Sequence, residues 1–211
     1  MLENGRLGGS IDQIELGFVE REATPKFLMK LSIQLHLLGL SLSNTFRVLE
    51  VFGIQHARST VHNWVHKVNL QSESGKNPDH VTVDETVIQL NDEQYWLYVA
   101  VDPETSELLH TSLETTTNTV IAQTVLAEIE EKHDASEAVF LVDDSHSLQA
   151  ACHQGGYDFR YEKHGNRNTV ERVFREIKRR TICFSNCFSN ATAETADDWI
   201  SSLSFAWNLL I

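Results

Sequence analysis

Cysteine is scarce in this sequence, which argues against a domain built on disulfides. The 211 residues include three cysteines, Cys152, Cys183 and Cys187. An odd number without a recognisable framework is unlike a small secreted domain. Cys183 and Cys187 could ligate zinc, but no second ligand pair stands at zinc spacing. Ordinary reduced cysteines are the preferred interpretation.

Long apolar runs are missing as well. Hydrophobic residues make up 41% of the chain, but no run approaches the roughly 18 residues of a membrane span. The first residues, Met1 to Arg6, lack the charged and then apolar pattern of a signal peptide. We therefore expect a cytoplasmic protein with no membrane partner.

Positive charge is in short supply and unevenly placed. Seventeen Lys and Arg stand against thirty Asp and Glu, a net charge of −13. Residues 160–180 hold eight basic and three acidic residues, a local +5 that leaves −18 for the rest. One basic stripe on an acidic body is typical of a protein that binds a polyanion. The acidic remainder suggests adaptation to high intracellular salt, a hypothesis that loss of activity in molar potassium chloride would contradict.

The first third of the chain is predicted to be helical. Residues 1–23 are polar and glycine-containing, which suggests a loosely packed arm. In residues 24–70, Phe27, Leu28, Leu31, Leu35 and Leu38 recur at helical spacing. A second helix is expected from Ser41, with Ser41 or Ser43 as its cap, to Gly53, and a third from about Thr60 to Val68, capped by Ser59 or Thr60.

Helix, glycine turn and helix together form a helix-turn-helix pattern, which places the third helix in a DNA groove. That helix offers four candidate DNA contacts, His62, Asn63, His66 and Lys67. A plain three-helix bundle without DNA contacts is the alternative. His62 and His66 share a helical face and could bind a metal, although surface positions are the preferred interpretation.

Residues 71–79 have the composition of a linker, and the periodicity changes after them. Alternation predicts a strand from His80 in which Val81, Val83, Glu85 and Val87 face one side. Two further strands follow at 95–101 and 107–113, giving an antiparallel meander. A helix at 119–132, a strand at 138–142, a short helix at 147–153, a strand at 157–161 and helices at 168–180 and 192–210 complete residues 80–211. This order predicts a mixed five-stranded sheet with flanking helices, the ribonuclease-H-like α/β fold.

Three carboxylates stand where these elements meet solvent. Asp84 lies in the first strand, Asp143 closes the fourth, and Glu171 lies on the basic helix beside its predicted buried stripe, with Lys178 two turns further on. Carboxylates in this number can hold two metal ions about 3.5–4 Å apart for phosphoryl transfer. Oxygen ligands favour Mg2+, or Mn2+ in vitro. Each carboxylate alone could equally be an edge residue or part of a surface ion pair.

The same residues carry a family resemblance. Ser59–Trp64, Val83–Thr86, Tyr95–Asp102, Phe140–Asp143 and His164–Thr181 are similar to motifs of DDE transposases, in particular the insertion-sequence-six-like group of halophilic archaea. The resemblance covers nearly the whole chain, and the last motif is the most specific. It implies that Asp84, Asp143 and Glu171 are the catalytic metal ligands and that Lys178 is the basic residue seven positions later. Asp144 departs from the family, in which a small residue usually follows the second Asp.

The resemblance also implies partners and activity. The expected partner is double-stranded DNA, as terminal inverted repeats and as target, with no small-molecule substrate. Strand cleavage by water, strand transfer by a 3′-hydroxyl and cointegrate formation are implied. A homodimer is expected, because two DNA ends must be held together. The basic helix would contribute DNA contacts through Arg167, Arg172, Arg175, Arg179 and Arg180.

Two other functions share these features. A nuclease of the same fold would hydrolyse DNA without joining it. A non-catalytic helix-turn-helix protein, or a degenerate transposase copy, would only occupy DNA. In the last case Asp84→Asn would leave every measurable activity unchanged.

Overall fold

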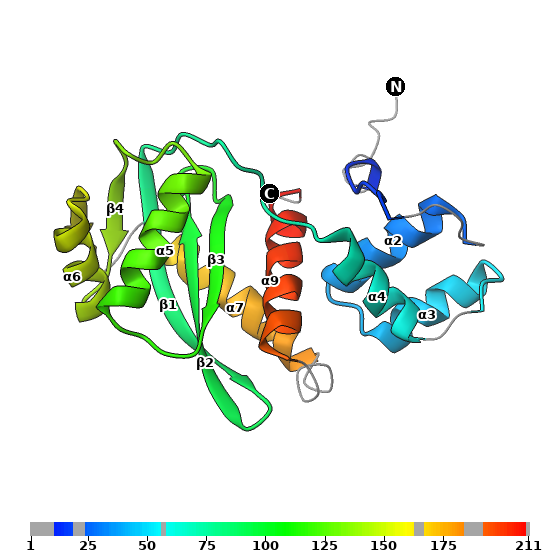
Figure 1. The fold of residues 1–211 in the computed structure, drawn as a ribbon. Coiled ribbons are helices and arrows are strands. Elements are labelled where there is room, and N and C mark those ends of the chain that lie inside the picture. The colour runs from blue at the N-terminus through cyan, green and yellow to red at the C-terminus, as the bar shows by residue number, and fades with distance from the viewer. Residues whose placement is uncertain (1–10, 19–23, 56–57, 163–166, 184–191, 210–211) are drawn as a thin grey trace. The chain divides into compact units, whose positions relative to one another are not determined.

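The computed structural model describes residues 11–18, 24–55, 58–162, 167–183 and 192–209, which divide between two compact units (Figure 1). One unit comprises Met1–Gln71 and Asp198–Leu210, and the other comprises Ser72–Asp197. The boundary thus falls at the start of the predicted 71–79 linker. The end of the chain, expected within an 80–211 domain, groups with the N-terminal unit instead. Within the described residues, no helix is both long and apolar enough to span a membrane.

Three helices form the body of the N-terminal unit: α2 (Lys26–Leu37), α3 (Leu42–Val51) and α4 (Arg58–Val68). Each packs against the other two. The buried side of α2 carries Met29, Ile33 and Leu37, whereas Phe27 of the predicted stripe is exposed. In the predicted N-terminal arm, Ile11, Ile14 and Leu16 are buried. That part of the arm is therefore packed rather than loose.

The helix ends agree with the predicted signals in part. Ser41 caps α3, because its hydroxyl oxygen accepts a hydrogen bond from the backbone N–H of Asn44 at 3.2 Å. Gly39 and Gly53 end α2 and α3 with positive φ angles of 113° and 77°, a conformation that glycine adopts without strain. α4 begins at Arg58, so Ser59 and Thr60 lie in its first turn rather than at its cap.

The second unit is built on one five-stranded sheet in the order β3-β2-β1-β4-β5. Its strands are β1 (His80–Leu90), β2 (Glu93–Val101), β3 (Leu108–Glu114), β4 (Val139–Val142) and β5 (Phe159–Tyr161). β1, β2 and β3 pair antiparallel, whereas β4 pairs parallel with both β1 and β5. These directions and this order are those of the ribonuclease-H-like fold, so the predicted fold class is confirmed.

Helices cover both faces of this sheet. α5 (Thr119–Lys132) and α6 (His146–Gly155) bury apolar side chains against Val81, Val83, Phe140 and Val142. α7 (Arg167–Cys183) packs on β1 and β2, and Figure 1 shows α5 and α7 on opposite sides of the sheet. α7 buries Val170, Val173, Phe174 and Ile177. This is the stripe predicted from helical spacing. The last helix, α9 (Ala193–Asn208), closes the described chain.

Hydrogen bonds attach the segment that follows Gln71 to the second unit. Ser72 is buried and donates its hydroxyl to the carbonyl oxygen of Leu109 at 3.0 Å. Lys132 donates to the Ser72 hydroxyl oxygen at 2.6 Å, and its own carbonyl oxygen accepts the Gly75 N–H at 2.8 Å. The linker composition predicted an irregular segment, but these bonds fix it in place.

Candidate functional site

The pairing of β1 with β4 explains why two distant aspartates meet. In this parallel pair Val81 lies opposite Phe140, and Thr82 lies opposite Leu141. Two residues further along both strands stand Asp84 and Asp143. Residues in register on adjacent parallel strands share a face and lie about 4.8 Å apart. The middle of β1 and the carboxyl end of β4 therefore place both side chains at one edge of the core.

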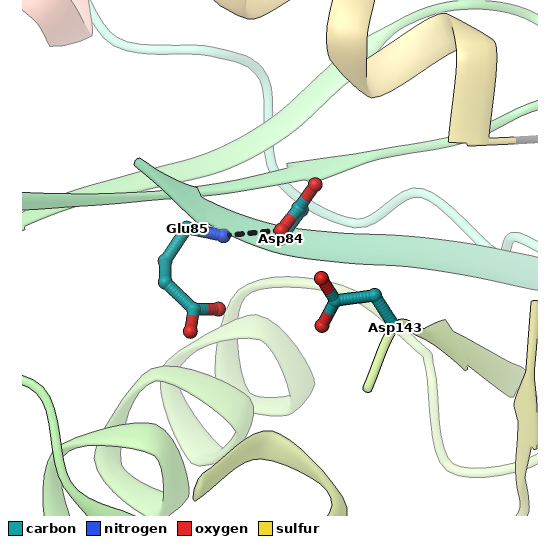
Figure 2. Close-up of side chains that lie close together, drawn as sticks. All are labelled: Asp84, Glu85 and Asp143. Carbon is teal, nitrogen blue, oxygen red and sulfur yellow. Dashed lines mark hydrogen bonds between the residues drawn. The ribbon is translucent and has the colours of Figure 1, made fainter. Parts of the chain in front are cut away.

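Figure 2 shows that Asp84, Glu85 and Asp143 form a carboxylate cluster. One possible ligand oxygen from each residue lies within 4.8 Å of the others. Asp84 is 6% exposed, and its Oδ1 accepts the backbone N–H of Glu85 at 2.9 Å. Asp143 is half-buried, and its Oδ1 accepts the backbone N–H of Ser145 at 2.8 Å. Local backbone bonds thus hold both aspartates in position.

Glu85 completes the cluster from the next position of β1. Its Oε1 accepts the Ser145 hydroxyl at 2.7 Å, and its Oε2 is buried with no hydrogen-bond partner among the described residues. The pKa of Glu85 is raised to about 7, chiefly by burial and in addition by the charges of Asp84 and Asp143, against the opposing Ser145 hydrogen bond. The side chain therefore changes charge near neutral pH.

The donor set fits a hard divalent cation. Three carboxylates converge, and one buried oxygen is left without a proton donor, which is a position that a cation would satisfy. Oxygen ligands favour Mg2+ or Mn2+ over zinc. Asp84, Asp143 and Glu85 are the residues that could hold such an ion.

Glu171, the third predicted ligand, lies on α7 and is exposed. Among the described residues, no group of three potential ligands brought within 4.8 Å includes it. Together with Lys178, it lines an open hollow of about 540 Å³ whose other lining residues are Phe174, Arg175 and Arg179. The structure therefore brings Glu171 and Lys178 together on one face of α7. Glu171 as a metal ligand stays a prediction.

The basic residues of α7 have different surroundings. Arg175 and Lys178 are exposed beside the hollow. Arg179 pairs with Glu176 one turn away, with nitrogen-oxygen distances of 2.8 and 2.6 Å. Arg172 donates to the hydroxyl oxygen of Ser106 at 3.4 Å. The side chains of Arg167 and Arg180 lie outside the described residues.

The four candidate DNA contacts of α4 separate into two pairs. Asn63 and Lys67 are exposed, whereas His62 and His66 are half-buried. The Lys67 ammonium lies 5.9 Å from the centre of the Phe18 ring. The two histidine rings contact one another, with 4.3 Å between their centres. Asn63 and Lys67 are thus the members of the set most open to a ligand.

Comparisons with known proteins found a relative in sequence and solved structures that resemble this chain. No protein-family model matches this chain. An uncharacterized protein of Methanocaldococcus jannaschii is 28% identical over 208 residues, covering 94% of this chain and 96% of that protein. The HTLV-2 integrase catalytic core domain in complex with magnesium matches at a TM-score of 0.44 and 16% identity, over 61% of this chain and 85% of that one. The catalytic domain of Mos1 mariner transposase matches at a TM-score of 0.35 and 13% identity, over 90% of this chain and 94% of that one. The fold assignment stands on strand order and directions alone.

Glu85 is the functional candidate that sequence reasoning missed. Strand alternation assigned it to the face opposite Asp84, among Val81 and Val83. Figure 2 shows the two side chains leaving β1 in different directions. The longer glutamate nevertheless reaches the same site, because β1 is open where β4 ends. In the sequence, the one signal that Glu85 belongs to the site was its position next to Asp84.

Proposed function

We propose that this protein is a DNA transposase that cleaves and joins DNA strands with divalent metal ions. The observation that carries this proposal is the convergence of Asp84, midway along β1, and Asp143, directly after the parallel strand β4. Paired strands in the middle of a sheet form a rigid platform, and the basic helix α7 packs on the same sheet. Acidic ligands beside a basic surface are what phosphodiester chemistry needs.

The proposed roles follow from position. Asp84 and Asp143 hold two Mg2+ ions, with Mn2+ as a substitute, and Glu171 provides the third carboxylate from α7. Bound metal ions would activate the attacking water or 3′-hydroxyl and stabilise the charge that develops on phosphate. The local backbone bonds to Asp84 and Asp143 keep both carboxylates aimed at the site before an ion arrives. Their preorganisation reduces the cost of assembling the centre.

Basic side chains would place the DNA. Lys178 and Arg175 line the hollow beside Glu171 and suit phosphate oxygens near the scissile bond. Arg172 and Arg179 have neighbours within the protein that they would exchange for phosphate. Arg167 and Arg180 belong to the same proposed surface.

The N-terminal unit would read the element ends. α4 carries Asn63 and Lys67 on its exposed side, as a recognition helix requires. A homodimer follows from the need to hold two ends at once. The sequence resembles the insertion-sequence-six-like group of halophilic archaea, and we propose that the protein belongs to that group and acts in the cytoplasm.

The deciding experiment is a strand-transfer assay with the element's own pre-cleaved end and a second DNA as target. Wild-type protein should join the two with Mg2+ or Mn2+ but not with chelator. Asp84→Asn and Asp143→Asn should each reduce joining by roughly a thousandfold, because each removes a ligand charge. Asp92→Asn, in the exposed β1–β2 turn, is the matched control. Metal-dependent cleavage without joining would indicate a nuclease, and unchanged activity in Asp84→Asn would contradict the proposal.

A further inference from the structure

A second cluster of potential metal ligands differs in chemistry from the carboxylate cluster, because its donor atoms are nitrogens. His62 and His66 stand one helical turn apart on α4, and their Nε2 atoms are 3.2 Å apart. The Nδ1 of His66 lies 3.3 Å from Oδ2 of Asp198. Asp198 belongs to the same compact unit as α4, although it is distant in sequence.

The contact with Asp198 orients the pair. A carboxylate accepts a hydrogen bond only from a protonated nitrogen, so Nδ1 of His66 carries the hydrogen. The lone pair of His66 then sits on Nε2, directed at Nε2 of His62. A carboxylate behind a histidine in this way fixes the ring and raises its basicity in metal sites.

The separation of the two nitrogens fits a shared ion. Two zinc–nitrogen bonds of about 2.0–2.1 Å at a tetrahedral angle place their nitrogens about 3.3 Å apart. In the metal-free protein the same separation accommodates one N–H···N hydrogen bond, donated by His62. An ion would take the place of that hydrogen, with His62 changing its tautomer.

The surroundings of His62 favour its neutral form, which a metal ligand needs. Burial lowers the pKa of His62, and the neighbouring His66 lowers it further, while the Asn63 side chain opposes the change. Nearby His36 is also buried, which lowers its pKa to about 4. Metal binding to His62 at neutral pH therefore has few protons to displace.

We propose that His62 and His66 bind a divalent transition metal ion, Zn2+ in particular, with Asp198 as the positioning carboxylate. Water would complete the coordination. Imidazole nitrogens select Zn2+ over Mg2+, so this site and the carboxylate cluster would take different ions. The ion would hold α4 next to Asp198 of α9 and stabilise the N-terminal unit.

The test measures Zn2+ binding by titration calorimetry on the full chain, stripped with chelator and kept in excess Mg2+ so that the carboxylate cluster is occupied. Wild type should bind one Zn2+ that His62→Gln and His66→Gln each weaken at least tenfold. Asp198→Asn should weaken it roughly tenfold, as expected for a carboxylate behind a ligand. His153→Gln, an exposed histidine in the other unit, and Asp84→Asn should bind as wild type does. Retained binding in Asp84→Asn separates this site from the proposed transposase centre.

A second measurement needs no variant. Zn2+ should protect His62 and His66 from acylation by diethylpyrocarbonate, read by peptide mass spectrometry, and should leave His153 reactive. Circular dichroism shows whether each variant is folded. Wild-type Zn2+ affinity in folded His62→Gln and His66→Gln, or Zn2+ bound without protection of the pair, would place the ion elsewhere, for example on cysteine. Either result overturns the proposal, as does the absence of Zn2+ binding by wild type at micromolar concentrations.

Discussion

Ser145 donates its hydroxyl hydrogen to Oε1 of Glu85 at 2.7 Å. This bond connects the loop after β4 to β1 at the point where the carboxylate cluster forms. It opposes the burial that raises the pKa of Glu85 to about 7. The site therefore holds a carboxylate that is costly to ionise until a cation arrives.

Glu85→Gln should stabilise the metal-free protein at pH 8. The folded-state pKa of Glu85 lies above its ordinary value of 4.5, so its unfavourable contribution grows as pH rises from 4.5 and is complete above 7. With allowance for partial exposure, the gain in unfolding free energy should be about 1–2 kcal/mol. Urea denaturation in chelator at pH 8 and pH 5 measures it, and the gain should be much smaller at pH 5.

The same substitution should weaken Mg2+ binding at pH 8, because it removes a ligand charge from the cluster. Glu137→Gln, at an exposed position in the same unit, serves as the control for both measurements. A Glu85→Gln protein that is no more stable and binds Mg2+ normally would remove Glu85 from the site.

Lys178→Ala should weaken binding of generic DNA about equally for all sequences. Removing one phosphate contact should lower the slope of log affinity against log salt by about 1. Fluorescence anisotropy over a salt series measures this slope. Lys26→Ala, an exposed lysine outside α7, should leave the slope unchanged, and an equal change in both variants would show a general charge effect only.

Glu171→Gln separates metal binding from DNA binding on α7. If Glu171 completes the metal centre, this variant should lose strand cleavage by roughly a hundredfold or more while it binds DNA as tightly as wild type or tighter, since a negative charge is removed. Cleavage at several Mn2+ concentrations provides the measurement. Wild-type cleavage would leave Asp84, Glu85 and Asp143 as the complete ligand set.

Asn63→Ala and Lys67→Ala should weaken binding to the element's terminal repeats by about 1–3 kcal/mol each if α4 reads bases. Metal-dependent nicking of generic DNA should persist, because the carboxylates belong to the other unit. Competition binding with specific and scrambled duplexes distinguishes the effects. A proportional loss of specific binding and nicking would argue against a separate reading helix.

Acid should destabilise the N-terminal unit through His36. Its Nδ1 hydrogen-bonds the carbonyl oxygen of Leu40 at 2.8 Å, and burial lowers its pKa from 6.5 to about 4. The stabilising contribution is complete above pH 6.5 and is lost as pH falls through 4, because the unfolded chain binds the proton first. The loss should total about 3 kcal/mol in unfolding free energy.

His36→Gln removes this titration and should flatten the decline between pH 7 and pH 4.5. Denaturant unfolding followed by tryptophan fluorescence, to which the buried Trp64 of the same unit contributes, measures the effect. An equal decline in wild type and His36→Gln would assign the acid sensitivity to other groups.

The order of elements in the second unit was predictable because its periodicities are local. Alternation marked β1, and the stripe of Val170, Val173 and Ile177 marked the buried side of α7. Helical spacing served less well in α2, where the apolar residues surround the helix and Phe27 is exposed. In that helix, packing against the neighbouring helices decides which side is buried.

The sequence alone predicted the order of the strands and helices along the chain, and it singled out Asp84 and Asp143 as candidate site residues, since Asp84 interrupts a recognisable strand and Asp143 follows one. Only the tertiary structure decided that β1 and β4 pair in the register that brings them together, and that Glu85 joins them. It also decided that Asp198 lies against His66, across 132 positions of sequence. Such contacts depend on how separate elements pack, and spacing along one element carries no information about its distance from another.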